Sequence, residues 1–309
     1  MAALYALKSV VESGYKFKRQ VRLIYGLNEE TGMECIEKYT ECERIPDMSF
    51  SPDGGYPVTN SEKSILRAAY KLEYASGINF KAGEAVNIVP GEAAVSFNGE
   101  SIVIKGHQAH ASTPQVGDNA AQKAIRYLAE QDLGAEDKKV VEVLNKYIGT
   151  GYYGEALDLD KADESGRLTL NVGLVNWDEN GFVITLDLRC PTSLPQEEIR
   201  EKLGNAFKEA GAEELSWDYS QGFSIPDDSE LVQSLMKVYQ NRSGDMDSKP
   251  QKIGGGTYAR HMPNAVSFGP EGYMCEADCH VANEYITIPQ LIMNSKMIAD
   301  AIIALACEE

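Results

Sequence analysis

The sequence predicts an α/β domain that carries an inserted α+β module, and three observations support this. Near the N-terminus a strand-like run is followed by a helical run, which is the βα unit of a parallel sheet. The middle of the chain instead alternates short strands with a hairpin turn and a few helices. After Pro226 the chain returns to helices, a glycine-rich loop and a short strand, so its two ends share one pattern of strands and helices.

The first sixty residues set out the βα pattern. MAALYALKSVVE (1–12) places its apolar residues near one helical stripe, although no capping residue precedes it. VRLIYG (21–26) is a short apolar run typical of a strand, and NEETGMECIEKYTE (28–41) predicts a helix whose early acids suit its positive end. MSFSPDGGYPVTN (48–60) is rich in Pro, Gly, Ser and Asn and predicts a loop leaving another short strand.

The middle of the chain predicts strands and helices in alternation. Strands are expected at 67–75, 92–97 and 101–106, followed by helices at 119–130 and 136–147. LTLNVGLVNW and FVITLDLR flank the turn Asp178–Gly181, which is a hairpin signal. A helix at 196–209 and a strand at 215–219 complete a module of hairpins with helices on one face.

The last part of the chain predicts a helix at 229–239, a loop at 254–256 and a strand at 265–268. A long helix begins near Pro289, because proline suits the first helical turn. The simplest architecture joins residues 1–61 and 223–309 in one α/β domain with a mainly parallel sheet and flanking helices. Residues 62–222 then form the inserted α+β domain.

The amino-acid composition excludes several classes of binding partner. The 309 residues carry 29 Lys and Arg against 47 Asp and Glu, a net charge of −18, which repels nucleic acid and anionic lipid. No window approaches the roughly 18 consecutive apolar residues of a membrane span, and no basic start precedes an apolar N-terminal run. The six cysteines lack C-x-x-C spacing, so reduced thiols are expected. We predict a cytoplasmic protein.

A group of acidic residues points to a metal site. Glu29 and Glu30 lie where a strand ends and a helix begins, the place where open α/β sheets bind ligands. Adjacent acids at a helix start also act simply on the helix dipole. Asp53 in the next strand-end loop and His280 in a late loop add two further ligand types. Three carboxylates and a histidine at one sheet edge suit zinc or manganese.

Several motifs carry a family resemblance. In chain order they are GLNEETG, ECIEKY, FSPDGGYPV, VNIVP, GHQAHASTPQVGDNA, LDLRCP, GGGTYAR and CHVANEYI. The set resembles the co-catalytic dizinc peptidases, which include aminoacylases, carnosinases and bacterial carboxypeptidases, and most closely the PepV-type dipeptidases. The resemblance implies that residues 1–61 and 223–309 form the catalytic domain and that 62–222 form a lid.

The resemblance also implies roles for individual residues. Glu29 would be the general base, Glu30 and His280 would share one metal ion, and Asp53 would bind the other. The cofactor would be two zinc ions, with manganese or cobalt as substitutes, and a metal-bridged water would attack the peptide. His110 would donate to the developing oxyanion, and Asn87 would help to hold the substrate.

Further residues are expected to bind the peptide itself. Arg189 and Arg260 are candidates to bind its free carboxylate, because a planar guanidinium accepts a carboxylate bidentately. Arg189 ends a strand and could equally be a surface ion-pair residue. Gly255, Gly256 and Thr257 belong to a glycine run without the Gly-Lys-Ser/Thr of a phosphate loop, so we predict a loop that exposes backbone to substrate.

Two motifs of the family are absent from this sequence. The early His-x-Asp does not occur, since none of His107, His110, His261 and His280 begins that pattern, and the Asp-Asp-Lys-Gly stretch does not occur either. We therefore expect a chain that lacks the family's N-terminal block, with an incomplete ligand set and impaired hydrolysis. Sheet edges exposed in this way would favour self-association.

The predicted function is metal-dependent hydrolysis of dipeptides, Xaa-Xaa or Xaa-His, with a small peptide as the partner molecule. An N-acyl-amino-acid or succinyl-diaminopimelate deacylase is the alternative enzyme, since the same site would act on another acyl group. A non-catalytic fragment that binds peptide or a partner chain is the alternative outside enzymes.

Overall fold

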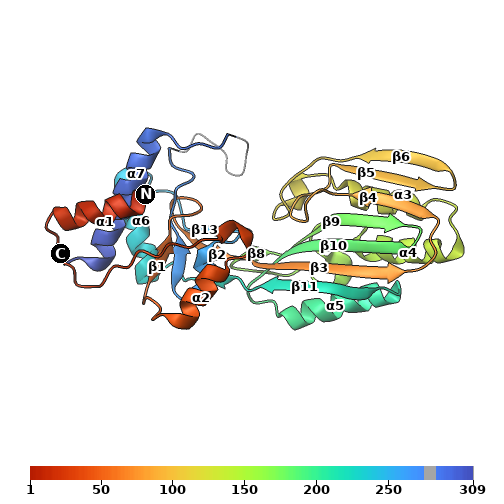
Figure 1. Cartoon of the computed structure of the whole chain (residues 1–309), viewed down its shortest axis with the longest axis horizontal. Coiled ribbons are helices and arrows are strands. Elements are labelled where there is room, and N and C mark those ends of the chain that lie inside the picture. The colour runs from red at the N-terminus through yellow and green to blue at the C-terminus, as the bar shows by residue number, and fades with distance from the viewer. Residues whose placement is uncertain (275–282, 309) are drawn as a thin grey trace. The chain divides into compact units, whose positions relative to one another are not determined.

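A computed structural model describes residues 1–274 and 283–308 (Figure 1). The chain divides into two compact units. Unit 1 comprises Met1–Glu62 with Phe223–Glu309, and unit 2 comprises Lys63–Gly222. The predicted roles of catalytic domain and lid remain predictions for these two parts.

Unit 1 is built on a small mixed sheet. Its strand order is β1-β14-β2-β12, with β13 also pairing with β2. The β1–β14 and β13–β2 pairs are parallel, whereas β12 and β14 run antiparallel to β2, so the predicted mainly parallel sheet is not confirmed. The strands are β1 (Ser49–Ser51), β2 (Thr59–Glu62), β12 (Phe223–Ser224), β13 (Gln251–Ile253) and β14 (Ala265–Ser267).

β2 is buried although its sequence is polar. Thr59, Asn60, Ser61 and Glu62 are at most 1% exposed. Two of these side chains donate to carbonyl groups: the Asn60 amide donates to the Ile225 carbonyl at 2.7 Å, and the Ser61 hydroxyl donates to the Phe223 carbonyl at 3.1 Å. The Thr59 hydroxyl has no hydrogen-bond partner among the described residues. Because the two bonds offset the cost of burial, β2 begins at Thr59 and Asn60, which the sequence placed at the end of a loop.

The described part of unit 1 contains four α-helices. Ser229 and Thr287 cap α6 and α7, as their side chains accept from backbone N–H groups of the first turn. By length and composition α7 could cross a membrane. Its face with Met297, Ile298 and Ile302 is buried in unit 1, where α7 packs against α1 and α6, which is typical of a core helix (Figure 1). The helices are α1 (Ala2–Glu12), α2 (Glu34–Cys42), α6 (Glu230–Ser243) and α7 (Ile288–Ala306).

The predicted strand VRLIYG is not a strand. Residues 20–26 have no regular secondary structure and belong to no ladder, and across the described ranges their backbone groups make no backbone–backbone hydrogen bond. The prediction of a strand was wrong because β propensity needs a neighbouring strand to pair with. The helix predicted directly after it is split into a 3₁₀ turn, η1 (Glu29–Thr31), and α2.

Unit 2 contains an antiparallel seven-stranded sheet of order β11-β3-β10-β9-β4-β5-β6. The predicted hairpin joins β9 to β10, and Gly181 there has φ +119° with no room for a Cβ beside the Leu72 carbonyl. The strands are β3 (Ser64–Glu73), β4 (Ile78–Ala82), β5 (Glu92–Phe97), β6 (Glu100–Lys105), β9 (Thr169–Asp178), β10 (Gly181–Cys190) and β11 (Glu213–Ser220), and β7 (Ala162–Asp163) pairs with β8 (Gly166–Arg167).

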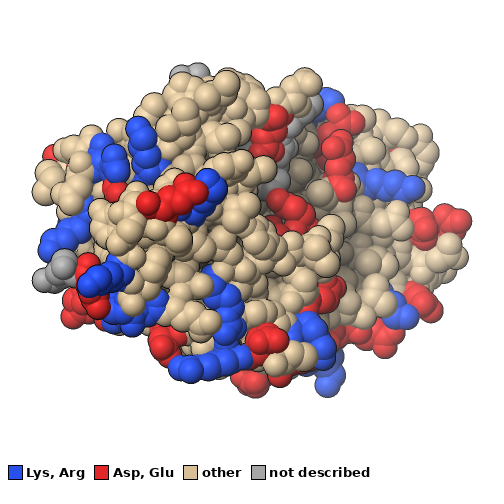
Figure 2. Space-filling view, turned by 60° about the vertical axis from the view of Figure 1, so that its left-hand side comes forward, with Lys and Arg blue, Asp and Glu red and all other residues tan. Residues whose placement is uncertain are grey.

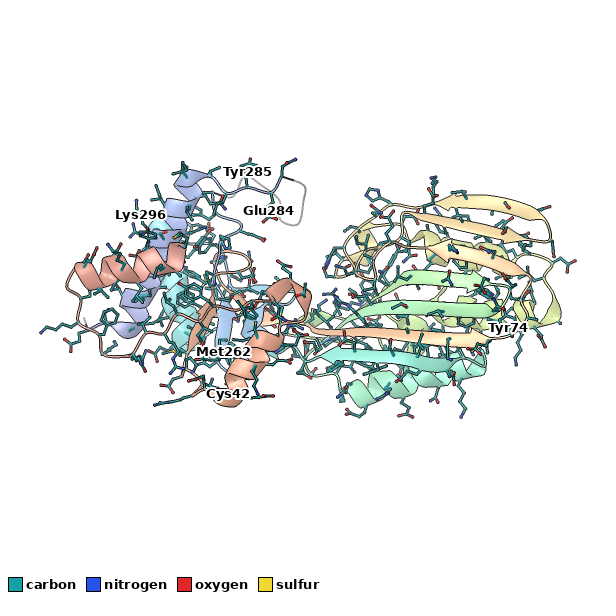
Figure 3. The ribbon with its side chains drawn as sticks, in the orientation of Figure 1. Cys42, Tyr74, Met262, Glu284, Tyr285 and Lys296 are labelled. Atoms are coloured by element: carbon teal, nitrogen blue, oxygen red, sulfur yellow. The ribbon has the colours of Figure 1, made fainter. Side chains whose placement is uncertain are left out.

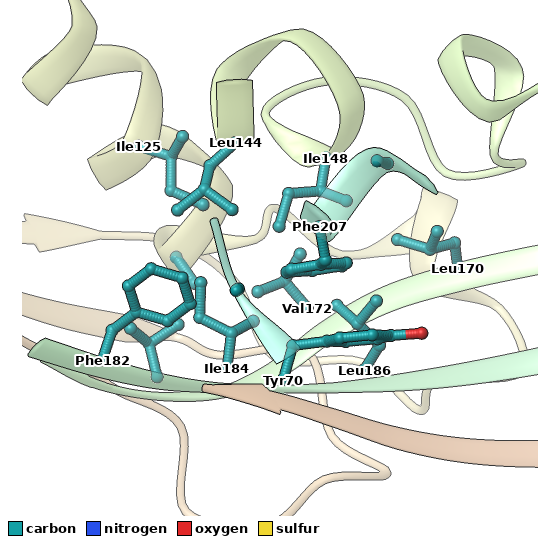
Figure 4. Packing of buried hydrophobic residues seen from close by; sticks show 14 of the residues in the cluster. Tyr70, Ile125, Leu144, Ile148, Leu170, Val172, Phe182, Ile184, Leu186 and Phe207 are labelled. Carbon is teal, nitrogen blue, oxygen red and sulfur yellow. The ribbon is translucent and has the colours of Figure 1, made fainter. Parts of the chain in front are cut away.

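Helices α3 (Ala120–Ala129), α4 (Ala135–Ile148) and α5 (Gln196–Glu209) supply the other half of the unit 2 core. Figure 4 shows their apolar side chains packed on one face of the sheet. The Tyr70 ring on β3 stacks on Phe207 of α5, with centroids 3.9 Å apart. Both units therefore combine helices with sheets, and the α/β class of the chain is confirmed at that level.

The unit 2 core can be tested through Leu128, which lies on α3 and is fully buried. Leu128→Ala should lower the free energy of unfolding by about 2–5 kcal/mol, because it leaves a cavity among well-packed neighbours. Both tryptophans of the chain, Trp177 and Trp217, lie in unit 2, so urea unfolding followed by their fluorescence reports this unit. Val103→Ala on β6, where Val103 is 52% exposed, should cost less than about 1 kcal/mol. Equal losses for both variants would contradict this core.

Candidate active site

The acidic pair Glu29 and Glu30 lies in η1, immediately before α2. Glu29 is half-buried and Glu30 is exposed. The turn is held by Asn28, whose side-chain oxygen accepts from the Cys35 backbone N–H at 3.1 Å and whose amide donates to Glu34. The pair therefore sits on a fixed turn, and its two carboxylates have different exposure.

Tyr258 lies beside this turn. Its hydroxyl is 3.0 Å from the Cys35 sulfur, and a Cβ on Gly26 would collide with it. Burial, the Cys35 contact and the nearby charge of Glu29 raise the pKa of Tyr258 to about 12, so the phenol keeps its proton. The hydrogen bond from Tyr258 in turn lowers the pKa of the Cys35 thiol. Tyr258 opens η4 (Tyr258–His261), and α2 contacts η4, so Glu29 and the glycine-rich loop are neighbours.

The glycine-rich loop is anchored by a buried carboxylate. Glu62 accepts from the Thr257 backbone N–H at 3.1 Å and from the Thr257 hydroxyl at 2.7 Å. It also accepts from Arg260 Nε at 3.1 Å. The Arg260 guanidinium donates in turn to the Gly255 carbonyl at 3.0 Å, and a Cβ on Gly256 would lie 2.5 Å from the guanidinium carbon. The loop thus wraps closely around Arg260.

This ion pair is almost inaccessible to water, since the Glu62 and Arg260 side chains are 0% and 3% exposed. Burial raises the pKa of Glu62 above its ordinary value, although the Arg260 charge and the Thr257 bonds oppose the rise. Arg260 is therefore committed to Glu62 and Gly255, and its predicted contact with a substrate carboxylate would have to share this pair. That contact stays a prediction.

Asp53 follows β1 and is half-buried, with Gly54 next to it in the left-handed region at φ +101°. His280, the other predicted ligand, lies outside the described residues. Within 1–274 and 283–308, no three His, Cys, Asp or Glu side chains form a group that could hold a metal ion. A catalytic zinc normally has three protein ligands, so this part of the chain does not by itself fit a complete zinc site.

The unit 2 candidates gather at one end of its sheet. Residues 88 and 110 form an antiparallel bridge, and the Ala111 N–H donates to the Asn87 carbonyl at 2.9 Å, which brings Asn87 close to His110. His110 is exposed, and its Nδ1 accepts from the Ser112 backbone N–H at 3.2 Å. Nδ1 also lies 2.7 Å from the Ser112 hydroxyl. A neutral ring that accepts at Nδ1 is the tautomer with its proton on Nε2.

Arg189 ends β10 near the same sheet end, but it is buried. Its guanidinium donates to Asp187 at 2.6 and 3.0 Å, and its side chain is 3% exposed. The surface ion pair considered from the sequence is thus an interior one, and binding of a substrate carboxylate by Arg189 stays a prediction.

The sequence did not reveal the partners of these residues. Glu62 lies just after the predicted loop at 48–60, and nothing in the sequence marks it as the partner of Arg260, 198 positions away. Tyr258, Cys35 and Ser112 lie within the motifs GGGTYAR, ECIEKY and GHQAHASTPQVGDNA, but the sequence assigned them no role. Figure 3 labels Cys42, the last residue of α2, and Met262, which directly follows η4, in the same region of unit 1.

Comparisons with known proteins decide the family. The model of the peptidase family M20/M25/M40 matches residues 1–304. The chain belongs to this family. This confirms the resemblance to metallopeptidases that its motifs indicate. Membership of the M20 family supports the assignment of the chain as a peptidase.

The M20 chain is similar to two curated relatives and to two solved structures. It is 32% identical to the putative dipeptidase YtjP of Bacillus subtilis, with 99% of this chain and 74% of YtjP covered. It is 28% identical to a putative dipeptidase of Staphylococcus haemolyticus, with 100% and 74% covered.

Its fold is similar to a Staphylococcus aureus tripeptidase, with TM-score 0.57, 16% identity and 98% and 69% of the chains covered. It is also similar to an aminoacylhistidine dipeptidase of Vibrio alginolyticus, with TM-score 0.56, 14% identity and 91% and 70% covered. At these identities the two structures show the shared fold alone.

The Glu62–Arg260 pair predicts a pH-dependent stability. The raised pKa means that folded unit 1 holds the Glu62 proton more tightly than the unfolded chain, so this contribution is present at low pH and lost as pH rises through the folded-state pKa. Arg260→Ala removes the opposing charge and leaves a buried carboxylate. We expect a loss of about 3–5 kcal/mol near neutral pH, larger at pH 8 than at pH 5.

Hydrogen exchange of α6 and α7 measures this loss in unit 1. Arg242→Ala is the matched control, because Arg242 pairs with Asp300 at the surface of the same unit and should cost less than about 1 kcal/mol. A loss in Arg260→Ala that does not change with pH would show that the Glu62 carboxylate is not the source.

Proposed function

We propose that this M20 chain derives from a dipeptidase that hydrolyses Xaa-Xaa or Xaa-His peptides. The observation that carries the proposal is the family match over residues 1–304, which includes the segments around Glu29, Asp53 and the glycine-rich loop. The relatives described as putative dipeptidases favour this substrate class over longer peptides.

In this proposal Glu29 is the general base. A carboxylate can accept a proton from the attacking water and pass it to the leaving amine, and such positioned proton transfer contributes about 10²–10⁴-fold. Two features support Glu29 over Glu30 in this role. Glu29 is half-buried on a fixed turn, and its charge acts on Tyr258 beside the loop proposed to bind substrate.

His110 and the glycine-rich loop are proposed to act on the peptide. The Nε2–H of His110 is a suitable donor to a carbonyl oxygen that gains negative charge. Gly255, Gly256 and Thr257 would offer backbone groups to the substrate, and Glu62 fixes the position of this loop through Thr257 and Arg260. Asn87, next to His110, is proposed to contact the same peptide.

Zinc is the proposed cofactor, with Glu30, Asp53 and His280 as ligands, and manganese or cobalt as substitutes. Zinc would supply Lewis-acid chemistry at the scissile carbonyl. Because the described residues contain no three-ligand group, we propose that the chain on its own binds metal weakly and hydrolyses dipeptides poorly.

The experiment supplies the ligands that the sequence lacks. A segment with His-x-Asp and Asp-Asp-Lys-Gly is fused before Met1, and hydrolysis of dipeptides is assayed with zinc or manganese. We expect turnover in the fusion, reduced about 10²–10⁴-fold by Glu29→Gln. Glu41→Gln is the control, since Glu41 lies on α2 in a surface pair with Lys38.

Two results would contradict the proposal. Turnover that is equal in the fusion and its Glu29→Gln variant would exclude Glu29 as the base. Faster hydrolysis of N-acetyl or N-succinyl amino acids than of dipeptides would favour the deacylase instead.

A further inference from the structure

Two loops of unit 2, which carry Asn87 and His110, are joined by backbone hydrogen bonds. The Asn87 loop (83–91) connects β4 to β5, and the His110 loop (106–119) connects β6 to α3. The Ala111 N–H donates to the Asn87 carbonyl at 2.9 Å, and the next residue of the Asn87 loop forms an antiparallel bridge with His110. The position of Asn87 relative to His110 therefore depends on how these two loops are held.

A buried amide on β9 holds the Asn87 loop. Asn171 is fully buried, and its side-chain amide donates to the Val86 carbonyl at 3.2 Å and to the Ile88 carbonyl at 3.0 Å. These two carbonyls belong to the residues directly before and after Asn87. Both N–H donors of the asparagine are thereby used, and neither leucine nor an ionised aspartate could supply them.

The same amide is bound to the His110 loop. Asn119, the last residue of that loop, donates through its side-chain nitrogen to the Asn171 side-chain oxygen at 2.8 Å and to the Val172 carbonyl at 3.1 Å. Its own side-chain oxygen accepts from the Gln122 backbone N–H and so caps α3. Asn171 is therefore the side chain through which the start of α3 and the Asn87 loop are connected.

Gly173, two residues further along β9, allows the Asn87 loop to approach this closely. A Cβ on Gly173 would lie 2.3 Å from the Val86 carbonyl oxygen and 2.9 Å from the Val86 Cα. The φ of Gly173 is outside the left-handed region, so the backbone conformation does not demand glycine here. The close contact with Val86 does.

The third candidate of unit 2, Arg189, lies on the neighbouring strand. In the β9–β10 ladder Asn171 pairs with Asp187 and Thr169 pairs with Arg189, and side chains paired in this way have Cβ atoms about 4.5–5.5 Å apart. The Thr169 hydroxyl donates to the Ala111 carbonyl at 3.3 Å. One face of β9 thus contacts both loops and faces the interior Arg189 pair.

We propose that Asn171 is a positioning residue, which holds Asn87 beside His110 so that both act on one peptide. The proposal rests on the function proposed above for these two residues. Asn171 acts through the Asn87 loop and does not touch the substrate. The simpler role for a buried asparagine is to satisfy backbone groups and stabilise the fold. The two roles differ in what the loss of Asn171 does to the loops and to substrate binding.

The test compares Asn171→Leu with Gln122→Leu in the whole chain. Gln122 of α3 is also a buried amide of unit 2, and it donates to the Ile148 and Gly151 carbonyls, each at 3.0 Å. Both substitutions remove one neutral amide with two bound donors, and neither alters the pattern of charged side chains shown in Figure 2. Urea unfolding followed by tryptophan fluorescence should show a similar loss of stability in the two variants.

Hydrogen exchange reports how the two loops are held and needs no enzymatic activity. The Ala111 amide, bonded to the Asn87 carbonyl, should exchange at least about tenfold faster in Asn171→Leu, because the loops open locally more often. Its exchange should stay unchanged in Gln122→Leu. Gly173→Ala displaces the Asn87 loop by steric contact and should also speed this exchange, so it provides the result if Asn171→Leu does not fold.

Kinetics supply the second measurement, in the fusion that carries the added metal ligands. Asn171→Leu should lower kcat/KM at least about tenfold, since catalysis is sensitive to small displacements of the groups that contact substrate. It should raise KM about fivefold, as expected for the loss of one hydrogen bond to the peptide. A smaller folded fraction alone would lower kcat and leave KM unchanged. Gln122→Leu should therefore keep the KM of the unsubstituted fusion.

Two results would overturn the proposal. One is equal exchange of the Ala111 amide in Asn171→Leu and Gln122→Leu, and the other is an unchanged KM in Asn171→Leu when the fusion is active. A fusion without turnover, or with turnover insensitive to Asn87→Ala and His110→Ala, would contradict the proposed function instead. The exchange of Ala111 would then still decide whether Asn171 holds the two loops together.

Discussion

The geometry of the candidate site depends on one buried carboxylate. Glu62 ends the central strand of the unit 1 sheet and binds Thr257 and Arg260, which lie almost two hundred residues further along the chain. By holding Thr257 it fixes the start of η4, and η4 carries Tyr258 to the turn of Glu29. The sheet, the glycine-rich loop and the proposed base are therefore linked through this one side chain.

Local sequence patterns correctly predicted the elements that are stabilised mainly by interactions within the element or by one apolar face. The helix at 196–209 forms with the predicted bounds, because its acidic first turn and apolar stripe act within the helix. The hairpin at Asp178–Gly181 forms because its turn suits two alternating strands. Residues 59–60 of β2 were predicted as the end of a loop and residues 21–26 as a strand, and both predictions were wrong. In both segments the secondary structure depends on residues distant in sequence. Such residues supply hydrogen bonds to TNSE, whereas no described strand pairs with VRLIY.

The motifs led to the right family, and the structure adds what surrounds the candidate residues. It shows Glu29 beside Tyr258 and Asn87 beside His110, each within its own unit. Sequence could not show that the guanidinium groups of Arg189 and Arg260 already bind interior carboxylates, because a partner is fixed by tertiary packing. The roles of these residues in substrate binding therefore depend on how firmly the two buried pairs hold, and the removal of one partner from such a pair is costly.

We infer that this M20 chain has too few metal ligands among its described residues to hold a catalytic zinc on its own. Zinc content and dipeptide turnover, measured on one sample of the purified chain after exchange into metal-free buffer, test it most directly. We expect substoichiometric zinc and no turnover above that of buffer. Two zinc ions retained per chain, together with dipeptide hydrolysis, would contradict it and would show that the chain completes its own metal site.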